Sequence, residues 1–472
     1  MTNERLQSLF TLPMDEQLRL FGDMSTLYPT RLVRRGRSAS EISIGKPIDL
    51  LYRVKGEARD IEGFMQRYRA AGLLILKHGA VVCERYALGQ TRETRWISFS
   101  MAKSASSTLI GAAIQHGLIA SIDEPVVRTV PDLRGSAYDG VSIRNVLQMS
   151  SGVRWNETYL DPHSDRRQLL TLQALAEPGA VLDYLRHLPR TSDPGTTFNY
   201  NTAETFLLGL ILIGAVKQTL SEYLSEKIWQ PCGMECDAYW QLESPEGQEF
   251  AGSGLSATLR DYARFAAFVL ADGVVDGERV LPESWMADST SNNPGSILEP
   301  GKLPGFEPLG YGYQWWTFPS RPGRRIFAAI GIFGQQIYVD VEEELAIVLT
   351  GAWPQPIDDP SRFESYDFFS AVTLHCTTAK DARIARTRIF RAGSGLSRTS
   401  AIRSNASARV PVRNVVSCEP QSKNASISAA TAVGRVIVGT WPASSKGTSR
   451  DPGMLRCMNS ESAIGLITSC RP

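Results

Sequence analysis

The pattern of hydrophobic positions predicts strands near both ends of a folded domain. Residues 72–89, GLLILKHGAVVCERYALG, form two apolar runs around a tight turn at His78-Gly79. Residues 324–353 contain a second pair, namely a strand, a turn at 341–344 and another strand. We therefore expect one antiparallel sheet whose strands come from both ends of the domain.

Segments with helical periodicity lie between these strands. They cover residues 98–117, 141–153, 202–218 and 258–273, and the first two are expected to end at Gly117 and Gly152. This order of elements predicts an α/β fold. We expect an antiparallel sheet flanked by helices, with a mainly helical region inserted between its strands.

The composition changes near Cys376. Residues 377–472 contain fifteen Lys or Arg against four Asp or Glu, and apolar periodicity is lost apart from 434–441. We expect a domain at 1–376 and a basic Ser/Arg-rich tail at 377–472 that is poorly ordered. Two origins stay open for this tail, a disordered extension or a segment translated in a shifted reading frame. Binding of nucleic acid through the tail is a further alternative.

The whole chain is close to neutral, with 50 Lys or Arg, 49 Asp or Glu and a net charge of +1. This balance gives no general reason to expect a nucleic acid or an anionic membrane as a partner. The longest apolar run, residues 206–216, is too short to span a bilayer, and the N-terminus does not resemble a signal peptide. The seven cysteines of the chain are scattered rather than arranged as a disulfide framework. We expect a cytoplasmic protein, and its oligomeric state stays open.

The candidate chemistry begins with a Ser-x-x-Lys pattern, which occurs at Ser43–Lys46 and at Ser100–Lys103. Lys46 precedes a proline, which disfavours helical geometry there. Ser100 instead stands at the start of a predicted apolar helix, where residues three apart share a face. Burial would lower the pKa of Lys103, and a neutral lysine can take the serine proton. A capping serine followed by an exposed lysine is the alternative for such a short motif.

The segment SFSMAKS, residues 98–104, resembles the nucleophile segment of the serine β-lactamase and penicillin-binding-protein superfamily. The resemblance implies that Ser100 is acylated and that Lys103 is its general base. Residues 194–209, PGTTFNYNTAETFLLG, resemble the Tyr-x-Asn segment of the same family. Tyr200 would then pass the proton to the leaving group. Thr202 replaces the usual asparagine, and we expect its hydroxyl to contact substrate.

The third family element, Lys-Thr-Gly or His-x-Gly, is replaced by AIGIFGQQIYVD at 329–340. This form resembles the 6-aminohexanoate-dimer hydrolase branch, which cleaves linear amides and also esters. The resemblance implies an oxyanion hole made by the backbone N–H groups of Ser100 and Ile332. Gly331 would allow close approach, and Phe333 would contact substrate where some relatives carry histidine. A β-bulge in a core strand is the alternative explanation for these glycines.

Further segments of residues 29–369 match the same branch, and Tyr159 matches a tyrosine that closes over substrate. No G-x-S-x-G elbow, phosphate-binding loop or metal-ligand spacing occurs, so we expect no cofactor and no metal. The sequence thus predicts a serine hydrolase for a small ester or linear amide. A catalytically silent binding or sensor protein of the same fold and a true β-lactamase remain alternatives.

Overall fold

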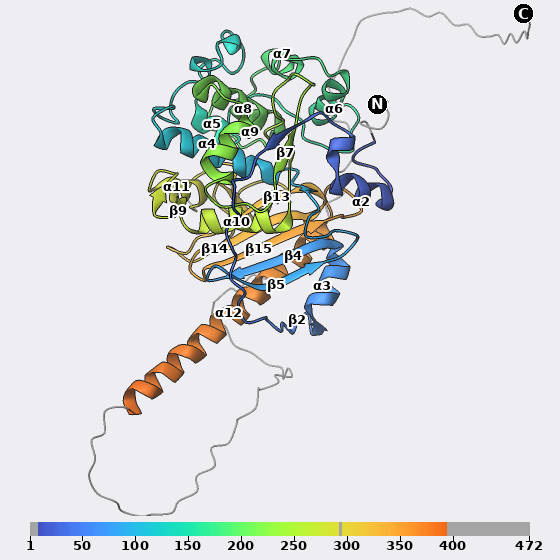
Figure 1. Ribbon diagram of the computed structural model, residues 1–472. Coiled ribbons are helices and arrows are strands. Elements are labelled where there is room, and N and C mark those ends of the chain that lie inside the picture. The colour runs from blue at the N-terminus through green and yellow to red at the C-terminus, as the bar shows by residue number, and fades with distance from the viewer. Residues whose placement is uncertain (1–7, 292–294, 394–472) are drawn as a thin grey trace, which may run out of the picture. The chain divides into compact units, whose positions relative to one another are not determined.

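The main sheet has seven antiparallel strands in the order β11-β12-β13-β14-β15-β4-β5 (Figure 1). The computed structural model of the protein describes residues 8–291 and 295–393. The strands of this sheet are β4 Ala70–Lys77, β5 Ala80–Tyr86, β11 Gly310–Tyr311, β12 Trp316–Thr317, β13 Ile326–Gly331, β14 Gln335–Asp340 and β15 Leu345–Gly351. Strands from both ends of the domain meet where β15 pairs with β4, as the hydrophobic pattern predicted.

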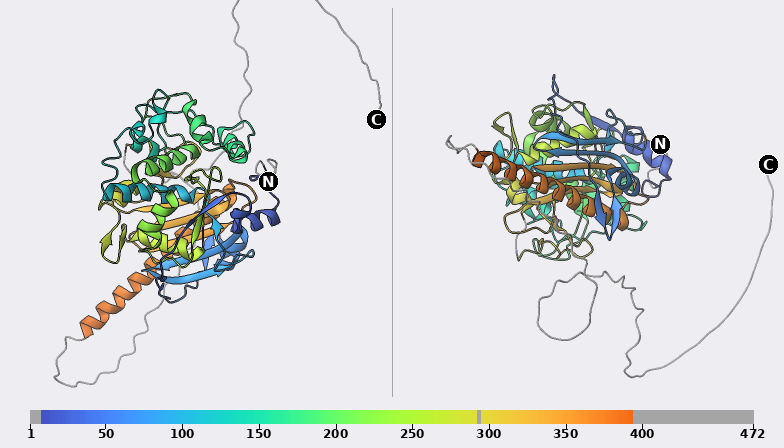
Figure 2. Two further views of the ribbon diagram at one scale, coloured as in Figure 1. Left: turned by 45° about the horizontal axis from the view of Figure 1, so that its top comes forward. Right: turned by 90° about the horizontal axis from the view of Figure 1, so that it is seen from below.

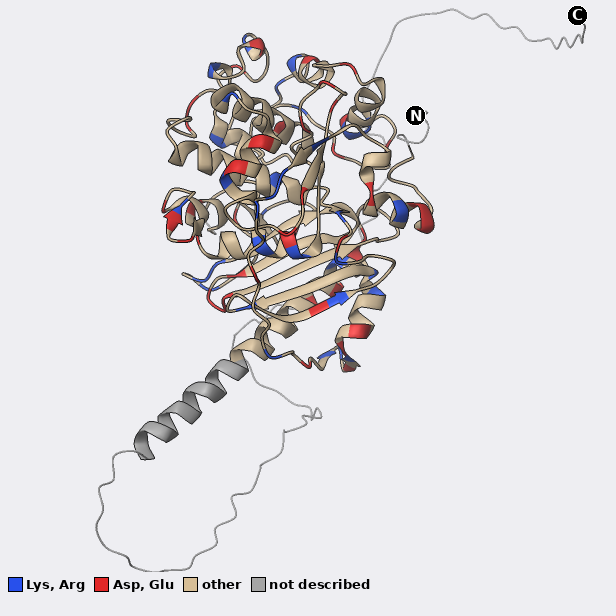
Figure 3. Cartoon of the chain, in the orientation of Figure 1, with Lys and Arg blue, Asp and Glu red and all other residues tan. Residues whose placement is uncertain are grey.

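The central strands β4 and β15 are almost entirely apolar because both faces of the sheet are covered. In β4, Leu73 and Ile75 join the core cluster beneath one face, whereas Leu74 and Leu76 join the cluster on the other. Successive side chains of a strand point to opposite faces, so a strand covered on both sides reads as a continuous apolar run. Figure 3 shows the result, a sheet centre almost free of charge between edges that carry both signs.

Helices pack on both faces of this sheet. One face is covered by α4 Met101–Gln115 and α10 Leu259–Leu270. The other is covered by α3 Ile61–Tyr68 and the first part of α12 Asp359–Gly393, and Figure 2 (right) shows α12 lying across the strands. Residue 376 lies inside α12, and most of the predicted tail lies outside the described residues. Contacts divide the chain into residues 1–396 and 397–472, and the separate tail stays a prediction.

A mainly helical region is inserted between the early and late strands, as predicted. Its helices are η2 Val126–Arg128, η3 Pro131–Leu133, α5 Ile143–Leu147, α6 Asp165–Leu175, α7 Ala180–Arg186, α8 Thr202–Val216, α9 Leu220–Leu224 and η4 Ser225–Trp229. The helix predicted for 141–153 is shorter than expected. It ends at Leu147 because the chain turns through Met149, whose φ of 53° is incompatible with a right-handed helix.

A second sheet contains the strand that directly precedes α4. It has the order β1-β7-β8-β6 and consists of β1 Thr30–Val33, β6 Trp96–Ile97, β7 Ala238–Gln241 and β8 Leu255–Ala257. The remaining short elements are η1 Met24–Thr26, β2 Tyr52–Val54, β3 Glu57–Arg59, β9 Val274–Val275, β10 Glu278–Arg279, α11 Trp285–Thr290 and η5 Ile332–Gly334. None of the described helices alone has the length and hydropathy to cross a bilayer; the bent pair α8 and α9–η4 meets both criteria only when taken together.

The segment predicted as one strand before residue 341 is two strands. β13 and β14 pair with each other, with Gly331 opposite Gln335, and η5 reverses the chain between them. The reversal uses a φ of 59° at Phe333 and of 90° at Gly334. A single strand was expected because both halves are apolar, and only a left-handed backbone at two successive residues distinguishes the turn.

The N-terminal segment packs against the β6–α4 connection and η5. It consists of residues 8–12, α2 Met14–Gly22 and η1. The rings of Phe10 and Phe21 are 1 % exposed or less, and Phe21 lies in a core cluster with Phe99 and Phe333. This segment precedes the region whose sequence resembles the family, yet it forms part of the same core.

Candidate active site

Ser100 stands where the chain leaves β6 and enters α4. Phe99 has a φ of 43°, and this left-handed residue turns the chain so that Ser100 becomes the N-cap of the helix. Its side chain does not cap the helix, and Ser100 lines a cavity. The hydroxyl is therefore available at a helix N-terminus, where developing negative charge is favoured.

Lys103 lies one turn further along α4 and is 2 % exposed. Its Nζ atom lies 3.0 Å from Ser100 Oγ, 3.0 Å from Thr202 Oγ1 and 2.9 Å from the Gly252 carbonyl oxygen. Burial lowers the pKa of Lys103 to about 7; the charge of Glu157 opposes this shift and that of Arg166 adds to it. A substantial fraction of this amine is thus uncharged near neutral pH.

These three neighbours orient the lone pair of the neutral amine. A neutral lysine has two N–H donors and one lone pair. The Gly252 carbonyl can only accept, and Thr202 donates its own O–H to Glu157, so its oxygen also accepts from Lys103. Both N–H bonds are then used, which leaves the lone pair directed at the Ser100 hydroxyl. The arrangement fits proton transfer from Ser100 to Lys103.

Glu157 accepts the hydrogen bond of the Thr202 hydroxyl that contacts Lys103. No sequence motif identified this glutamate. One carboxylate oxygen accepts from Trp155 Nε1 at 2.6 Å and from the Thr202 amide at 3.0 Å. The other accepts from Thr202 Oγ1 and from the Tyr159 hydroxyl, the latter at 3.1 Å. Arg166 Nε lies 3.8 Å away. Glu157 stands two residues before Tyr159 in a loop, where one acidic residue carries no pattern that marks it.

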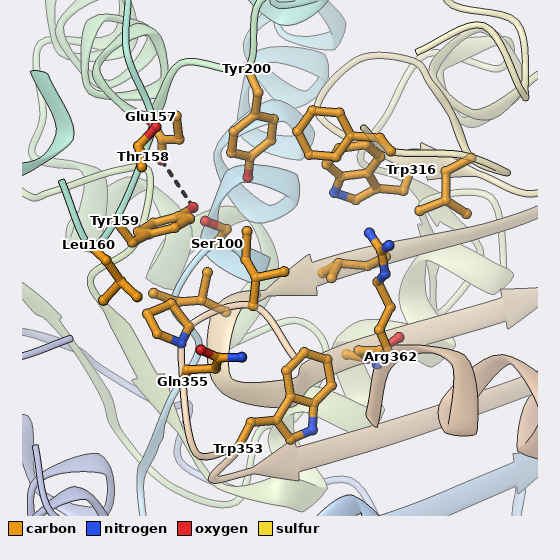
Figure 4. Close-up of a pocket in the computed structure, with 18 of the residues that line it drawn as sticks. Ser100, Glu157, Thr158, Tyr159, Leu160, Tyr200, Trp316, Trp353, Gln355 and Arg362 are labelled. Atoms are coloured by element: carbon orange, nitrogen blue, oxygen red, sulfur yellow. Dashed lines mark hydrogen bonds between the residues drawn. The ribbon is translucent and has the colours of Figure 1, made fainter. Parts of the chain in front are cut away.

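Tyr200 directs its hydroxyl toward Ser100 (Figure 4). Its ring stacks on Trp316 with centroids 5.5 Å apart, and Lys103 Nζ lies 5.1 Å from the ring centroid. Burial raises the pKa of Tyr200, and a hydrogen bond with the Ser100 side chain partly opposes this rise. The phenol thus stays protonated at neutral pH and can donate a proton near Ser100.

Gly331, at the end of β13, lies against the backbone of the β6–α4 connection. A Cβ atom at this position would meet Ser98 O at 2.4 Å and Ser100 N at 3.1 Å. Only glycine therefore allows the strand this close. The next residue, Ile332, lines the same cavity as Ser100.

A mostly apolar cavity of about 460 Å³ opens over Ser100. Glu157, Tyr159 and Leu160 stand on one side of Ser100 in Figure 4, and Trp316 and Arg362 stand on the other. Aromatic and aliphatic side chains supply most of the wall: Tyr159, Leu160, Tyr200, Phe306, Leu309, Trp316, Ile330, Ile332, Trp353, Pro356, Ile357 and Tyr366. Such a cavity suits a small, largely apolar molecule.

Comparison with known proteins shows the family of this chain. A family model described as Beta-lactamase matches residues 58–364. The chain belongs to this family. A 6-aminohexanoate-dimer hydrolase of Paenarthrobacter ureafaciens is 29 % identical over 77 % of this chain and 91 % of that protein.

Solved structures share the β-lactamase fold of this chain. A structure from Bacillus anthracis, provisionally assigned as a 6-aminohexanoate-dimer hydrolase, has a TM-score of 0.69 and 22 % identity, covering 77 % of this chain and 95 % of that one. EstCE1, a hydrolase with promiscuous acyltransferase activity, has a TM-score of 0.53 and 16 % identity, covering 66 % and 96 %. The predicted β-lactamase-like α/β fold and the resemblance to the 6-aminohexanoate-dimer hydrolase branch are confirmed.

The structure of this β-lactamase family member brings six of the eight candidate residues to one cavity. Ser100, Tyr159, Tyr200, Gly331 and Ile332 line it, and Lys103 lies directly beneath Ser100. Neither of the other two, Thr202 and Phe333, lines the cavity. Thr202 is 1 % exposed, and its hydroxyl contacts Lys103 and Glu157.

Phe333 was also expected to contact substrate. Its ring is fully buried and packs on Phe21 and Phe99 instead, because its positive φ turns the side chain into the core. In the structure Thr202 is placed to position Lys103 and Phe333 lies behind the cavity wall; contact of either side chain with substrate stays a prediction. Within residues 8–291 and 295–393, no three His, Cys, Asp or Glu side chains gather in a metal-binding arrangement.

Proposed function

We propose that this β-lactamase family member is a serine hydrolase that cleaves small esters or linear amides. The observation that supports it most is the 3.0 Å separation between Ser100 Oγ and Lys103 Nζ, in a site where burial lowers the lysine pKa to about 7. A serine hydroxyl becomes a nucleophile when an adjacent base removes its proton. The similarity to a 6-aminohexanoate-dimer hydrolase supports the same class of bond.

The acylation step uses groups that meet at the cavity. Ser100 Oγ attacks the substrate carbonyl carbon while Lys103 takes the hydroxyl proton. The negative charge on the former carbonyl oxygen is stabilised by the N–H groups of Ser100 and Ile332. The carbon–oxygen or carbon–nitrogen bond of the leaving group then breaks, and Tyr200 gives the leaving group its proton. Tyr200 regains a proton from Lys103.

In deacylation water takes the place of the Ser100 hydroxyl as the attacking group. A water molecule attacks the acyl–Ser100 ester, and Lys103 takes a proton from this water. The bond between the acyl carbon and Ser100 Oγ then breaks, Lys103 gives its proton to Oγ, and the carboxylic acid leaves with the Ser100 hydroxyl and the neutral amine restored. The two steps together need only water and groups of this chain.

Covalent labelling tests the proposal. A fluorophosphonate probe should label the full-length protein at Ser100, and hydrolysis of p-nitrophenyl butyrate should be lost in Ser100→Ala together with the labelling. Ser43→Ala, the serine of the other Ser-x-x-Lys pattern, serves as the matched control and should leave both unchanged. A folded protein that is never labelled and turns over no ester or amide would instead indicate a catalytically silent binding protein.

A further inference from the structure

Arg362 brings a positive charge to the wall of an otherwise apolar cavity. It lies in the first turn of α12 and lines the same space as Ser100. In Figure 4 its guanidinium extends from α12 toward Trp316, on the side of Ser100 opposite Glu157. Its side chain is 19 % exposed, so most of it has been removed from water.

The guanidinium of Arg362 has an N–H donor without an acceptor in the described part of the chain. One nitrogen, Nη2, pairs with Asp359 Oδ1 at 2.9 Å. The Nε–H group is buried and meets no acceptor among the described residues. Arginine has five N–H donors, and a buried donor without an acceptor is costly. An acceptor supplied by a ligand would remove this cost.

The other charged residue that lines the cavity does not offer a comparable site for a cation. Glu157 already accepts from Trp155, Tyr159 and Thr202, and Arg166 lies beside it. The charge balance of the cavity therefore favours an anionic ligand. Its apolar wall strengthens this preference, because an ion pair is stronger where water is excluded.

We propose that Arg362 binds a carboxylate of the substrate, so that the enzyme prefers esters or amides whose apolar chain ends in a carboxylate. The guanidinium fork matches a carboxylate in a two-point contact. The chain between the scissile carbonyl and this carboxylate would lie along Trp316 and Ile330, which line the cavity together with Arg362. This inference rests on the proposed hydrolase function and adds the substrate class to it.

The test compares esters that differ only in the terminal group. In the first pair the acyl chain carries the charge: the mono-4-nitrophenyl ester of adipate against 4-nitrophenyl hexanoate. In the second pair the leaving group carries it: the butyrate ester of 6-hydroxyhexanoate against that of hexan-1-ol. We expect a higher kcat/KM for the charged member of at least one pair, by about 10- to 100-fold, the range for a charge-assisted hydrogen bond.

Variants show whether this preference comes from Arg362. Arg362→Leu should lower the ratio of the two kcat/KM values by about 10- to 100-fold, and Arg362→Lys should keep part of the ratio because the charge remains. Arg186→Leu is the matched control. Arg186 also pairs with an aspartate three residues earlier, Asp183, but it lies on α7 and does not line the cavity. Equal rates within both pairs, or a preference that survives Arg362→Leu, would overturn the inference.

A binding measurement separates failure of this inference from failure of the proposed function. Calorimetry would compare hexanoate with hexanamide on the intact protein. Stronger binding of hexanoate that disappears in Arg362→Leu supports the carboxylate site even if no ester is turned over. Hydrolysis of the neutral esters without either preference would leave the hydrolase proposal standing and remove the role of Arg362.

Discussion

The rings of Phe99 and Phe333 pack against each other with centroids 5.5 Å apart, and both residues have a left-handed backbone, with φ of 43° and 59°. Phe99 directly precedes Ser100 and Phe333 directly follows Ile332, the two residues whose amides we assign to the oxyanion hole. Phe21 of the N-terminal segment packs on both rings, and its ring centroid lies 5.1 Å from each of theirs. Three phenyl groups thus connect the two strained turns that place these amides, and the N-terminal segment supplies one of them.

Phe21→Ala tests this connection. We expect a loss of roughly 3–5 kcal/mol in the free energy of unfolding, as for other buried phenylalanines. We also expect kcat to fall about tenfold, a fraction of the cost of removing an oxyanion donor outright. Phe64→Ala is the control, because Phe64 is equally buried but stacks on Phe368 between α3 and α12, in a different core cluster. Equal losses of kcat in the two folded variants would contradict a specific role for Phe21.

The pH dependence of turnover follows from Lys103. The amine must be neutral to accept the Ser100 proton, and its pKa is about 7. The kcat/KM value for a neutral ester should therefore rise with pH and level off above about 7. Lys103→Ala should lower kcat/KM by about 10²- to 10⁴-fold and abolish this rise. Steady-state kinetics at several pH values would give kcat/KM for the parent protein and for Lys103→Ala. If kcat/KM of the variant rose with pH as that of the parent does, Lys103 would be excluded as the base.

The charges beside Lys103 should move this profile in opposite directions. Glu157 raises the lysine pKa and Arg166 lowers it. In Glu157→Gln the midpoint of the profile should shift to lower pH, and in Arg166→Met it should shift to higher pH. Thermal unfolding of each variant checks that it folds. Shifts of the same sign would show that the midpoint reports a group other than Lys103.

Glu204 makes the stability of the protein depend on pH. It is buried on α8, Oε1 accepts from Ser151, and Oε2 has no partner among the described residues. Burial raises its pKa from 4.5 to about 8. Between pH 4.5 and about 8 the folded protein keeps the Glu204 proton, whereas the unfolded chain has released it. The free energy of unfolding therefore falls as pH rises through this range.

Glu204→Gln should remove this part of the pH dependence. The free energy of unfolding of the parent protein should fall more steeply from pH 5 to pH 8 than that of the variant, as measured by denaturant titration at several pH values. Glu243→Gln offers a comparison, because Glu243 also has a raised pKa but accepts hydrogen bonds from the Val181 and Gly179 amides. Identical slopes in the parent and Glu204→Gln would show that Glu204 stays ionised in the fold.

The elements that the sequence predicted correctly depend on contacts close along the chain. The turn at His78-Gly79 joins β4 to β5. Helix α4 begins directly after Ser100 and ends two residues before Gly117, which has a left-handed φ of 70°. Hydrophobic periodicity and a Ser-x-x-Lys spacing are local properties, and helix geometry brings residues three apart to the same face. The pairing of Ser100 with Lys103 was therefore accessible from the sequence.

The surroundings of this pair were not accessible in the same way. Glu157 and Arg362 lie 57 and 262 residues beyond Ser100 in the chain, and each is one charged residue among many. The turn at 332–334 was missed because it interrupts an apolar run. Thr202 was expected at the substrate and instead faces Lys103, because α8 begins with its first turn against α4.

The order of elements, the covered sheet and the local geometry of Ser100 and Lys103 were determined by the sequence itself, through periodicity and chain geometry. The tertiary structure alone decided the lowered pKa of Lys103, the acceptors that orient its amine and the charge that Arg362 brings to the cavity wall. The physical reason is that pKa values and hydrogen-bond partners depend on burial and on neighbours brought together from distant parts of the chain.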